Sequence, residues 1–139
     1  MRSFVLLLLA AWPMLDTAAA QDTQTSIQGS WQIVALQDGG RTAPAEAIEG
    51  AEWVITRDLI VQKAGGQTLE LSYTLDPSNA PKWIDLKAEG RTMLGIYKLE
   101  GKTLTVCFSE ARGAERSTAF ESQPESVNDV LIVLTREGA

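Results

Sequence analysis

The sequence predicts an all-β protein: a closed antiparallel up-and-down barrel of about eight to nine strands with one short helix after the first strand. Two observations lead to this fold. Short runs rich in branched and aromatic residues follow one another along most of the chain. Turn residues separate nearly all of these runs, so consecutive strands can pair as antiparallel neighbours. A long meander has two unpaired edges, and closure into a barrel removes both.

The first residues are expected to lie outside the barrel. Arg2 supplies positive charge, and residues 4–12 form an apolar run that is too short to span a bilayer. The small residues at 18–20 are typical of a signal-peptidase site, so residues 1–20 are interpreted as a signal peptide. Residues 21–28 are polar and unpatterned and are interpreted as a flexible tether. These features predict an exported protein, periplasmic or extracellular, with no integral membrane segment after cleavage.

The barrel domain is predicted to span residues 29–137. Its first strand is expected at residues 30–36 and ends at the turn sequence QDGG. The helix is predicted over residues 43–50, because Pro44 lies near its start and Gly50 can end it.

The next three strands are delimited by turn residues. Residues 51–56 and 59–64 are rich in branched side chains, and the second run stops at two glycines. Adjacent glycines predict a hairpin because glycine readily adopts positive φ. Residues 68–75 alternate apolar and polar side chains, which predicts a strand with one buried face, and this strand stops at DPSNAP.

Five further runs complete the chain. Strands are predicted at residues 82–88, 93–99, 103–108 and 129–137, with a weaker one at 117–122. The last run contains VLIVL, the most apolar stretch after the signal peptide. Such a stretch suits a strand that pairs with the first one and closes the barrel.

The composition narrows the classes of function. A chain of 139 residues is expected to form one domain, and its net charge of −6 argues against nucleic acid and against anionic membranes as partners. The sequence contains no His, which removes the commonest general base and the commonest metal ligand. We therefore predict no catalytic residues, no metal site, no cofactor and no enzymatic activity. The single cysteine, Cys107, is interpreted as a buried apolar residue rather than a reactive thiol.

Two aspartates stand out among the carboxylates. Asp76 begins DPSN and is expected to cap a turn. Asp85 lies within a strand and shares one face with Trp83 and Lys87. That face could line the barrel interior beside an aromatic ring, or it could face outward with an Asp85–Lys87 charge pattern and a partly exposed Trp83. The alternation favours the outward orientation.

Aromatic side chains are distributed over different strands, and four of them are candidates for binding a ligand. An eight-stranded barrel is just wide enough to be filled by side chains or to hold one small ligand. The supply of branched and aromatic residues here favours a mostly filled interior. The candidate ligand-binding residues are Trp53, Tyr73, Trp83 and Tyr97.

Four segments carry a family resemblance: IQGSWQIVALQDGG, LDPSNAPKWIDL, MLGIYKLEGKTLTVCFS and VLIVLTRE. In order and spacing they resemble a bacterial lipocalin-like domain family that is abundant in planctomycetes and has no assigned function. One departure is Ser117, where the family leads us to expect proline. Gly29, Trp31 and Arg136 also resemble the lipocalin arrangement, in which an arginine from the end of the chain packs over the indole. The resemblance implies a barrel closed by these three residues, and it implies no reaction.

Together these observations predict a small exported lipocalin-like barrel. The main hypothesis is a non-enzymatic binding module for a small apolar or amphipathic molecule. The alternative is an envelope protein-interaction module, such as a small barrel inhibitor of a protease, with residues 21–28 as its trunk. An enzyme would require carboxylates from separate strands to converge.

Overall fold

The computed structural model describes residues 27–110, 115–122 and 129–137. The proposed signal peptide and residues 21–26 of the proposed tether lie outside these ranges. The described residues contain nine strands and one short helix. In chain order these are β1 (Gly29–Asp38), β2 (Arg41–Thr42), α2 (Ala45–Ile48), β3 (Glu52–Ile55), β4 (Leu59–Ala64), β5 (Gln67–Asp76), β6 (Lys82–Ala88), β7 (Arg91–Glu100), β8 (Thr103–Ser109) and β9 (Asp129–Arg136).

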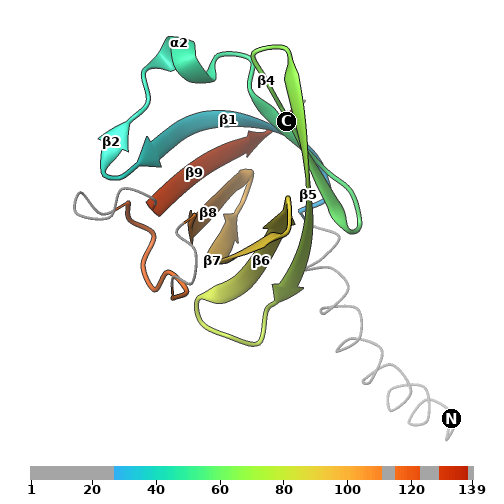
Figure 1. The fold of residues 1–139 in the computed structure, drawn as a ribbon, viewed down its shortest axis with the longest axis vertical. Helices are drawn as coiled ribbons and strands as arrows, with labels where there is room; N and C mark the ends of the chain where they lie inside the picture. Colours follow the sequence, from blue (N-terminus) through green and yellow to red (C-terminus); the bar gives the residue numbers. More distant parts are fainter. Residues whose placement is uncertain (1–26, 111–114, 123–128, 138–139) are drawn as a thin grey trace, which may run out of the picture.

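The strands form the predicted closed antiparallel barrel (Figure 1). Each strand from β3 to β9 pairs with its neighbour in the chain, and β1 pairs with both β3 and β9. The β1–β9 ladder runs from Trp31 opposite Arg136 to Asp38 opposite Val130, and it closes the ring. Eight strands make up this ring, and β2 is an additional short strand paired only with the end of β1. The predicted fold class is confirmed.

Three local predictions differ from the structure. The turn after β1 continues into β2, because Gly39 and Gly40 adopt φ of 59° and 80° and fold the chain back on itself. The helix covers only Ala45–Ile48, since Ala43 donates its N–H to the Leu36 carbonyl before the helix begins. Residues 117–122 form no strand, because β8 and β9 already pair with each other and leave no open edge there.

A β-bulge in β1 determines which side chains face the interior. The pairing with β9 shifts register between Ile33 and Ala35. Val34 is the extra residue and is 47% exposed. Because one residue is inserted, the alternation restarts, and Leu36 and Asp38 lie opposite β9 residues that belong to the core. The second half of β1 therefore directs a leucine and an aspartate toward the barrel interior.

One end of the barrel is closed as expected for Gly29, Trp31 and Arg136. The Trp31 indole is fully buried, and the guanidinium carbon of Arg136 lies 4.2 Å from the centre of its ring. Gly29 has φ of 128°, and a Cβ there would lie 3.0 Å from Arg136 Nη1. Only glycine combines this backbone conformation with this close approach.

The chain just before β1 takes part in the same closure. The indole Nε1 of Trp31 donates to the Ile27 carbonyl at 2.7 Å, and Arg136 Nη1 donates to the Gln28 carbonyl at 2.9 Å. The Ile27 side chain is itself buried in the core. These two residues had been assigned to the flexible tether. They belong to the barrel instead, because Trp31 needs a partner for its N–H and Ile27 supplies it.

Candidate binding cavity at the barrel mouth

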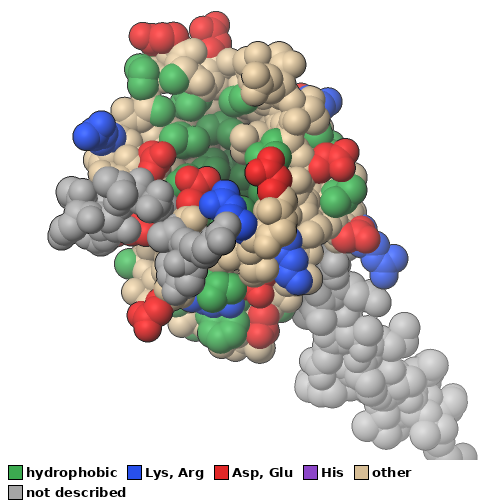
Figure 2. Space-filling view, viewed as in Figure 1, with side chains coloured by type: hydrophobic (Ala, Val, Ile, Leu, Met, Phe, Trp, Pro, Cys, Tyr) green, Lys and Arg blue, Asp and Glu red, His purple; other side chains and the backbone are tan. Residues whose placement is uncertain are grey.

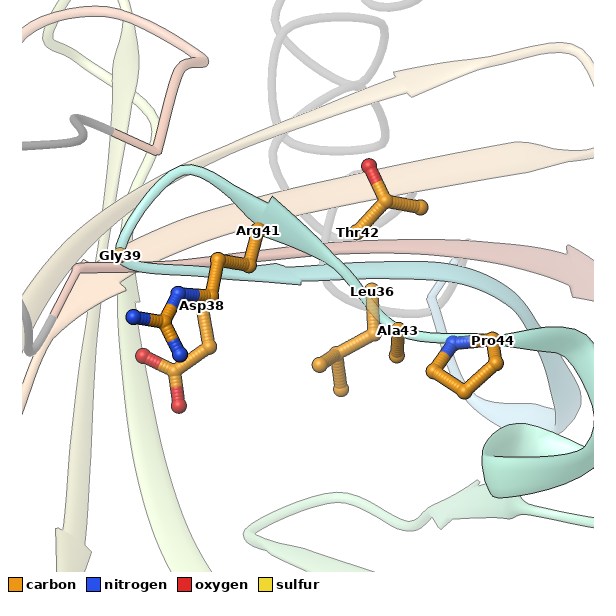
Figure 3. Close-up of a pocket in the computed structure, with 7 residues that line it drawn as sticks. All are labelled: Leu36, Asp38, Gly39, Arg41, Thr42, Ala43 and Pro44. Carbon is orange, nitrogen blue, oxygen red and sulfur yellow. The ribbon is translucent and has the colours of Figure 1, made fainter.

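The end opposite Trp31 is open and contains a cavity of about 520 Å³. Its described lining comes from the end of β1, the following turn, β2 and the segment that leads to α2: Leu36, Asp38, Gly39, Arg41, Thr42, Ala43 and Pro44. Figure 3 shows the side chains of Leu36, Asp38 and Arg41 on the same side of this hairpin, with Thr42 pointing to the other. The bulge in β1 produces this arrangement.

The apolar side chains in the described lining of the cavity are those of Leu36, Ala43 and Pro44. Leu36, Ile48, Ala64 and Ala88 are partly buried and pack against the core cluster. Leu69 lies on the face of β5 that also carries Leu71 and Tyr73 of the core, yet it is 38% exposed. Residues 67–71 of β5 pair with β4 but not with β6, so Leu69 lies on a hairpin end that extends past β6 beside the mouth. Figure 2 shows a hollow with a hydrophobic wall on this face of the molecule.

Charged groups of both signs lie at the mouth. Asp38 and Arg41 are opposite each other in the β1–β2 pairing. Burial, followed by the negative charge of Asp38, raises the pKa of Glu110, while the nearby Arg91 acts to lower it. Arg91 also donates from Nη1 to the Glu110 carbonyl at 3.3 Å. The mouth therefore offers an apolar wall together with acceptors and donors at its rim, which suits a small amphipathic molecule.

Three of the four aromatic residues that sequence analysis proposed for ligand binding lie in the core. Trp53 is buried and donates its indole N–H to Gln62 Oε1 at 2.9 Å. Tyr73 donates its hydroxyl to the Thr56 carbonyl, and Tyr97 is 1% exposed. These rings fill the barrel toward its closed end, and none of them is among the described residues that line the cavity.

Trp83, the fourth candidate, lies on the outer wall. It is 38% exposed, and its neighbours in the strand, Ile84 and Leu86, point into the core. Asp85 shares the outer face, as the alternation favoured. Its ion-pair partner is Arg116, at 2.7 Å between Oδ1 and Nη1, whereas the sequence pattern had suggested Lys87. Sequence reasoning missed Arg116 because it comes from a distant segment without regular structure.

Cys107 and Asp76 occupy the environments expected for them. Cys107 is fully buried, and burial raises the pKa of its thiol, which disfavours the reactive thiolate. Asp76 accepts hydrogen bonds from the backbone N–H and hydroxyl of Ser78 and from the side chain of Asn79. These bonds lower the pKa of Asp76 and form the turn cap that the sequence predicted.

The cavity residues themselves were not singled out from the sequence. The sequence QDGG indicated a turn after the first strand, but nothing in the run SWQIVALQD indicates the bulge. With unbroken alternation, Leu36 and Asp38 would share the outward face with Ser30 and Gln32. The signal that could have located them is the presence of two charged residues, Asp38 and Arg41, flanking a two-glycine turn.

No group of three or more His, Cys, Asp or Glu side chains within residues 27–110, 115–122 and 129–137 could hold a metal ion. Across the same ranges, the structure has no helix with the length and apolar character needed to cross a membrane.

Comparison with known proteins identifies no relative. No protein-family model matches this chain, and no curated protein and no solved structure matches it.

Proposed function

We propose that this chain is a non-enzymatic binding protein for a small amphipathic molecule held at the mouth of the barrel. The observation that carries the proposal is the cavity of about 520 Å³ with Leu36 on its wall and Asp38 and Arg41 beside it. A volume of this size lies within the range of ligand pockets, roughly 300–1,000 Å³. The apolar part of the ligand would contact Leu36 and Leu69, and its polar group would stay near the charged rim.

The filled half of the barrel supports this location. Trp31, Trp53 and Tyr97 occupy the interior toward the closed end, which favours the mouth as the place where a ligand enters. The arrangement of Trp31 under Arg136 is the one that the lipocalin-like resemblance implied. We retain membership of that family, and export of the chain, as parts of the proposal.

A matched pair of leucines tests the site. Leu69 and Leu59 are 38% and 39% exposed, but Leu69 lies on the inner face at the mouth and Leu59 on the outer face. The purified protein is titrated with a hydrophobic fluorophore such as anilinonaphthalene sulfonate, with fatty acids and alkyl amines as competitors. We expect saturable binding that Leu69→Arg weakens at least about tenfold and Leu59→Arg leaves unchanged. A tenfold loss corresponds to about 1.4 kcal/mol.

Two outcomes would contradict the proposal. One is the absence of saturable binding to the folded protein. The other is an equal effect of Leu69→Arg and Leu59→Arg, which would place the fluorophore on the outer surface. Far-UV circular dichroism of each variant establishes that the barrel is intact before binding is measured.

The protein-interaction alternative depends on residues 21–28 acting as a trunk. Ile27 and Gln28 contact Trp31 and Arg136 of their own barrel, so they are not available to a partner while the barrel is closed. A variant that lacks residues 21–26 and keeps Ile27 and Gln28 tests whether partner binding depends on residues 21–26.

A further inference from the structure

A segment without regular structure covers part of the outer wall of the barrel. Residues 115–122, here called the strap, lie between β8 and β9 in the chain (Figure 1, orange). Ile96 and Cys107 face each other on neighbouring strands and are 1% and 0% exposed, although neither belongs to the barrel core. Cys107 Sγ donates to the Glu121 carbonyl at 3.4 Å, which places the strap over this pair.

Arg116 anchors the strap to the wall. Its Nη1 lies 2.7 Å from Asp85 Oδ1 and 2.8 Å from the Gly95 carbonyl oxygen, and its guanidinium carbon lies 4.1 Å from the centre of the Trp83 ring. The Arg116 side chain is only 16% exposed, so these contacts are partly shielded from water and salt. A charge-assisted hydrogen bond combined with a stacked ring is a strong local attachment.

The other end of the strap is attached to the rim of the cavity. The buried hydroxyl of Ser122 donates to the Asp129 carbonyl at 2.9 Å and accepts a hydrogen bond from the Gly40 N–H at 2.7 Å. Gly39 donates to the same Asp129 carbonyl at 2.9 Å. Gly39 lines the cavity, and Gly40 follows it in the β1–β2 turn. The strap therefore touches both the outer wall and the turn that borders the mouth.

We propose that the strap is a latch for the cavity rim. With Arg116 docked against Asp85, Ser122 holds the β1–β2 turn to the start of β9. When the strap leaves the wall, Ser122 leaves Gly40, and the turn loses one of the hydrogen bonds that position it. The barrel wall itself is closed by strand pairing and remains folded during this local opening. The inference concerns the strap alone and holds whether or not a ligand binds the cavity.

The sole cysteine of the chain reports strap release directly. Cys107 reacts with a thiol reagent such as dithionitrobenzoate only when the strap has moved, and amide exchange of Gly40, followed by NMR, reports the rim. We expect Arg116→Ala and Asp85→Asn to accelerate both labelling of Cys107 and exchange of Gly40 by at least about tenfold. Lys63→Ala, which removes the exposed Lys63–Glu52 ion pair on β3 and β4, is the control and should change neither rate.

Urea separates strap release from global unfolding. Labelling through release of the strap is nearly independent of low urea concentrations, because little surface is exposed, whereas labelling through global unfolding rises steeply. The proposal is overturned if Cys107 labelling in the native protein follows global unfolding. It is equally overturned if Arg116→Ala accelerates Cys107 labelling and leaves Gly40 exchange unchanged. Should Arg116→Ala fail to fold, the near-isosteric Asp85→Asn decides the same question.

Discussion

The closed end of the barrel gives the sharpest prediction, the replacement of Trp31 by alanine. The Trp31 side chain has no solvent exposure, and its truncation is expected to lower the free energy of unfolding by about 3–5 kcal/mol. The stacked Arg136 accounts for about 0.5–2 kcal/mol of this loss. The hydrogen bond from Nε1 to the Ile27 carbonyl adds about 1 kcal/mol. Filling of the barrel end by the indole supplies the remainder.

A second tryptophan provides the matched control. Trp83 also lies under an arginine, with Arg116 at 4.1 Å compared with 4.2 Å for Arg136 over Trp31, but Trp83 is 38% exposed. Trp83→Ala should therefore cost less than about 1.5 kcal/mol. Because a stacked cation is common to both tryptophans, the difference between the two variants measures burial together with the hydrogen bond from Trp31 Nε1 to the Ile27 carbonyl.

Urea denaturation followed by far-UV circular dichroism measures both variants without relying on tryptophan fluorescence. A domain of this size has a stability of about 5–15 kcal/mol, so Trp31→Ala removes a large share of it. Trp31→Phe keeps a ring beneath Arg136 and loses the N–H donor, and it should cost about 1–3 kcal/mol. A loss below about 1 kcal/mol for Trp31→Ala would show that the indole does not close the barrel.

Three further measurements test the interior and the mouth. Gly95→Ala should destabilise the barrel by about 1–3 kcal/mol or more in urea denaturation, because its Cβ would lie 2.7 Å from the Cys107 carbonyl oxygen; an unchanged midpoint would contradict this close packing. Burial raises the pKa of Tyr97 to about 12 and that of Tyr73 above 10.0. The contribution of the two neutral phenols to the free energy of unfolding is therefore complete below pH 10 and is lost as the pH rises through these raised pKa values. Absorbance at the phenolate band should rise together with unfolding, and a titration near pH 10 in folded protein would contradict this. Because the pKa of Glu110 is raised, the neutral carboxyl contributes fully to the free energy of unfolding below pH 4.5, the ordinary pKa of a glutamate, and this contribution is lost as the pH rises through the raised pKa. Glu110→Gln should therefore flatten that part of the curve of stability against pH.

The sequence predictions were accurate where a feature depends on residues that are neighbours in the chain. The hairpin between β4 and β5 was predicted from Gly65 and Gly66, which adopt positive φ of 58° and 78°. The inward face of β5 was predicted from its alternation, which has no irregularity. Both depend on neighbouring residues in the chain, and local preference is sufficient to specify them.

Predictions that depended on distant segments were less accurate. Residues 117–122 carry strand-like side chains, but their place in the sheet is taken by the β8–β9 pairing. The candidate ligand-binding aromatics were chosen by residue type, and their depth in the barrel depends on closure at Trp31 and on the packing of all eight strands. Depth along a barrel axis depends on the registers of many strand pairs, which the residue pattern of one strand does not encode.

The sequence by itself determined the succession of strands and turns and the antiparallel barrel, while the closing contact of Gly29, Trp31 and Arg136 was implied by the resemblance to the lipocalin arrangement. The strands, turns and barrel follow from side-chain alternation and from glycine at positive φ. Only the tertiary structure decided that Leu36 and Asp38 face the mouth, that a cavity remains there, and that Arg116 attaches the strap to Asp85. The physical reason for the first two is that a one-residue bulge moves the side chains after it to the other face of the sheet. The reason for the third is that an ion pair between residues far apart in the chain forms only once the barrel wall has closed.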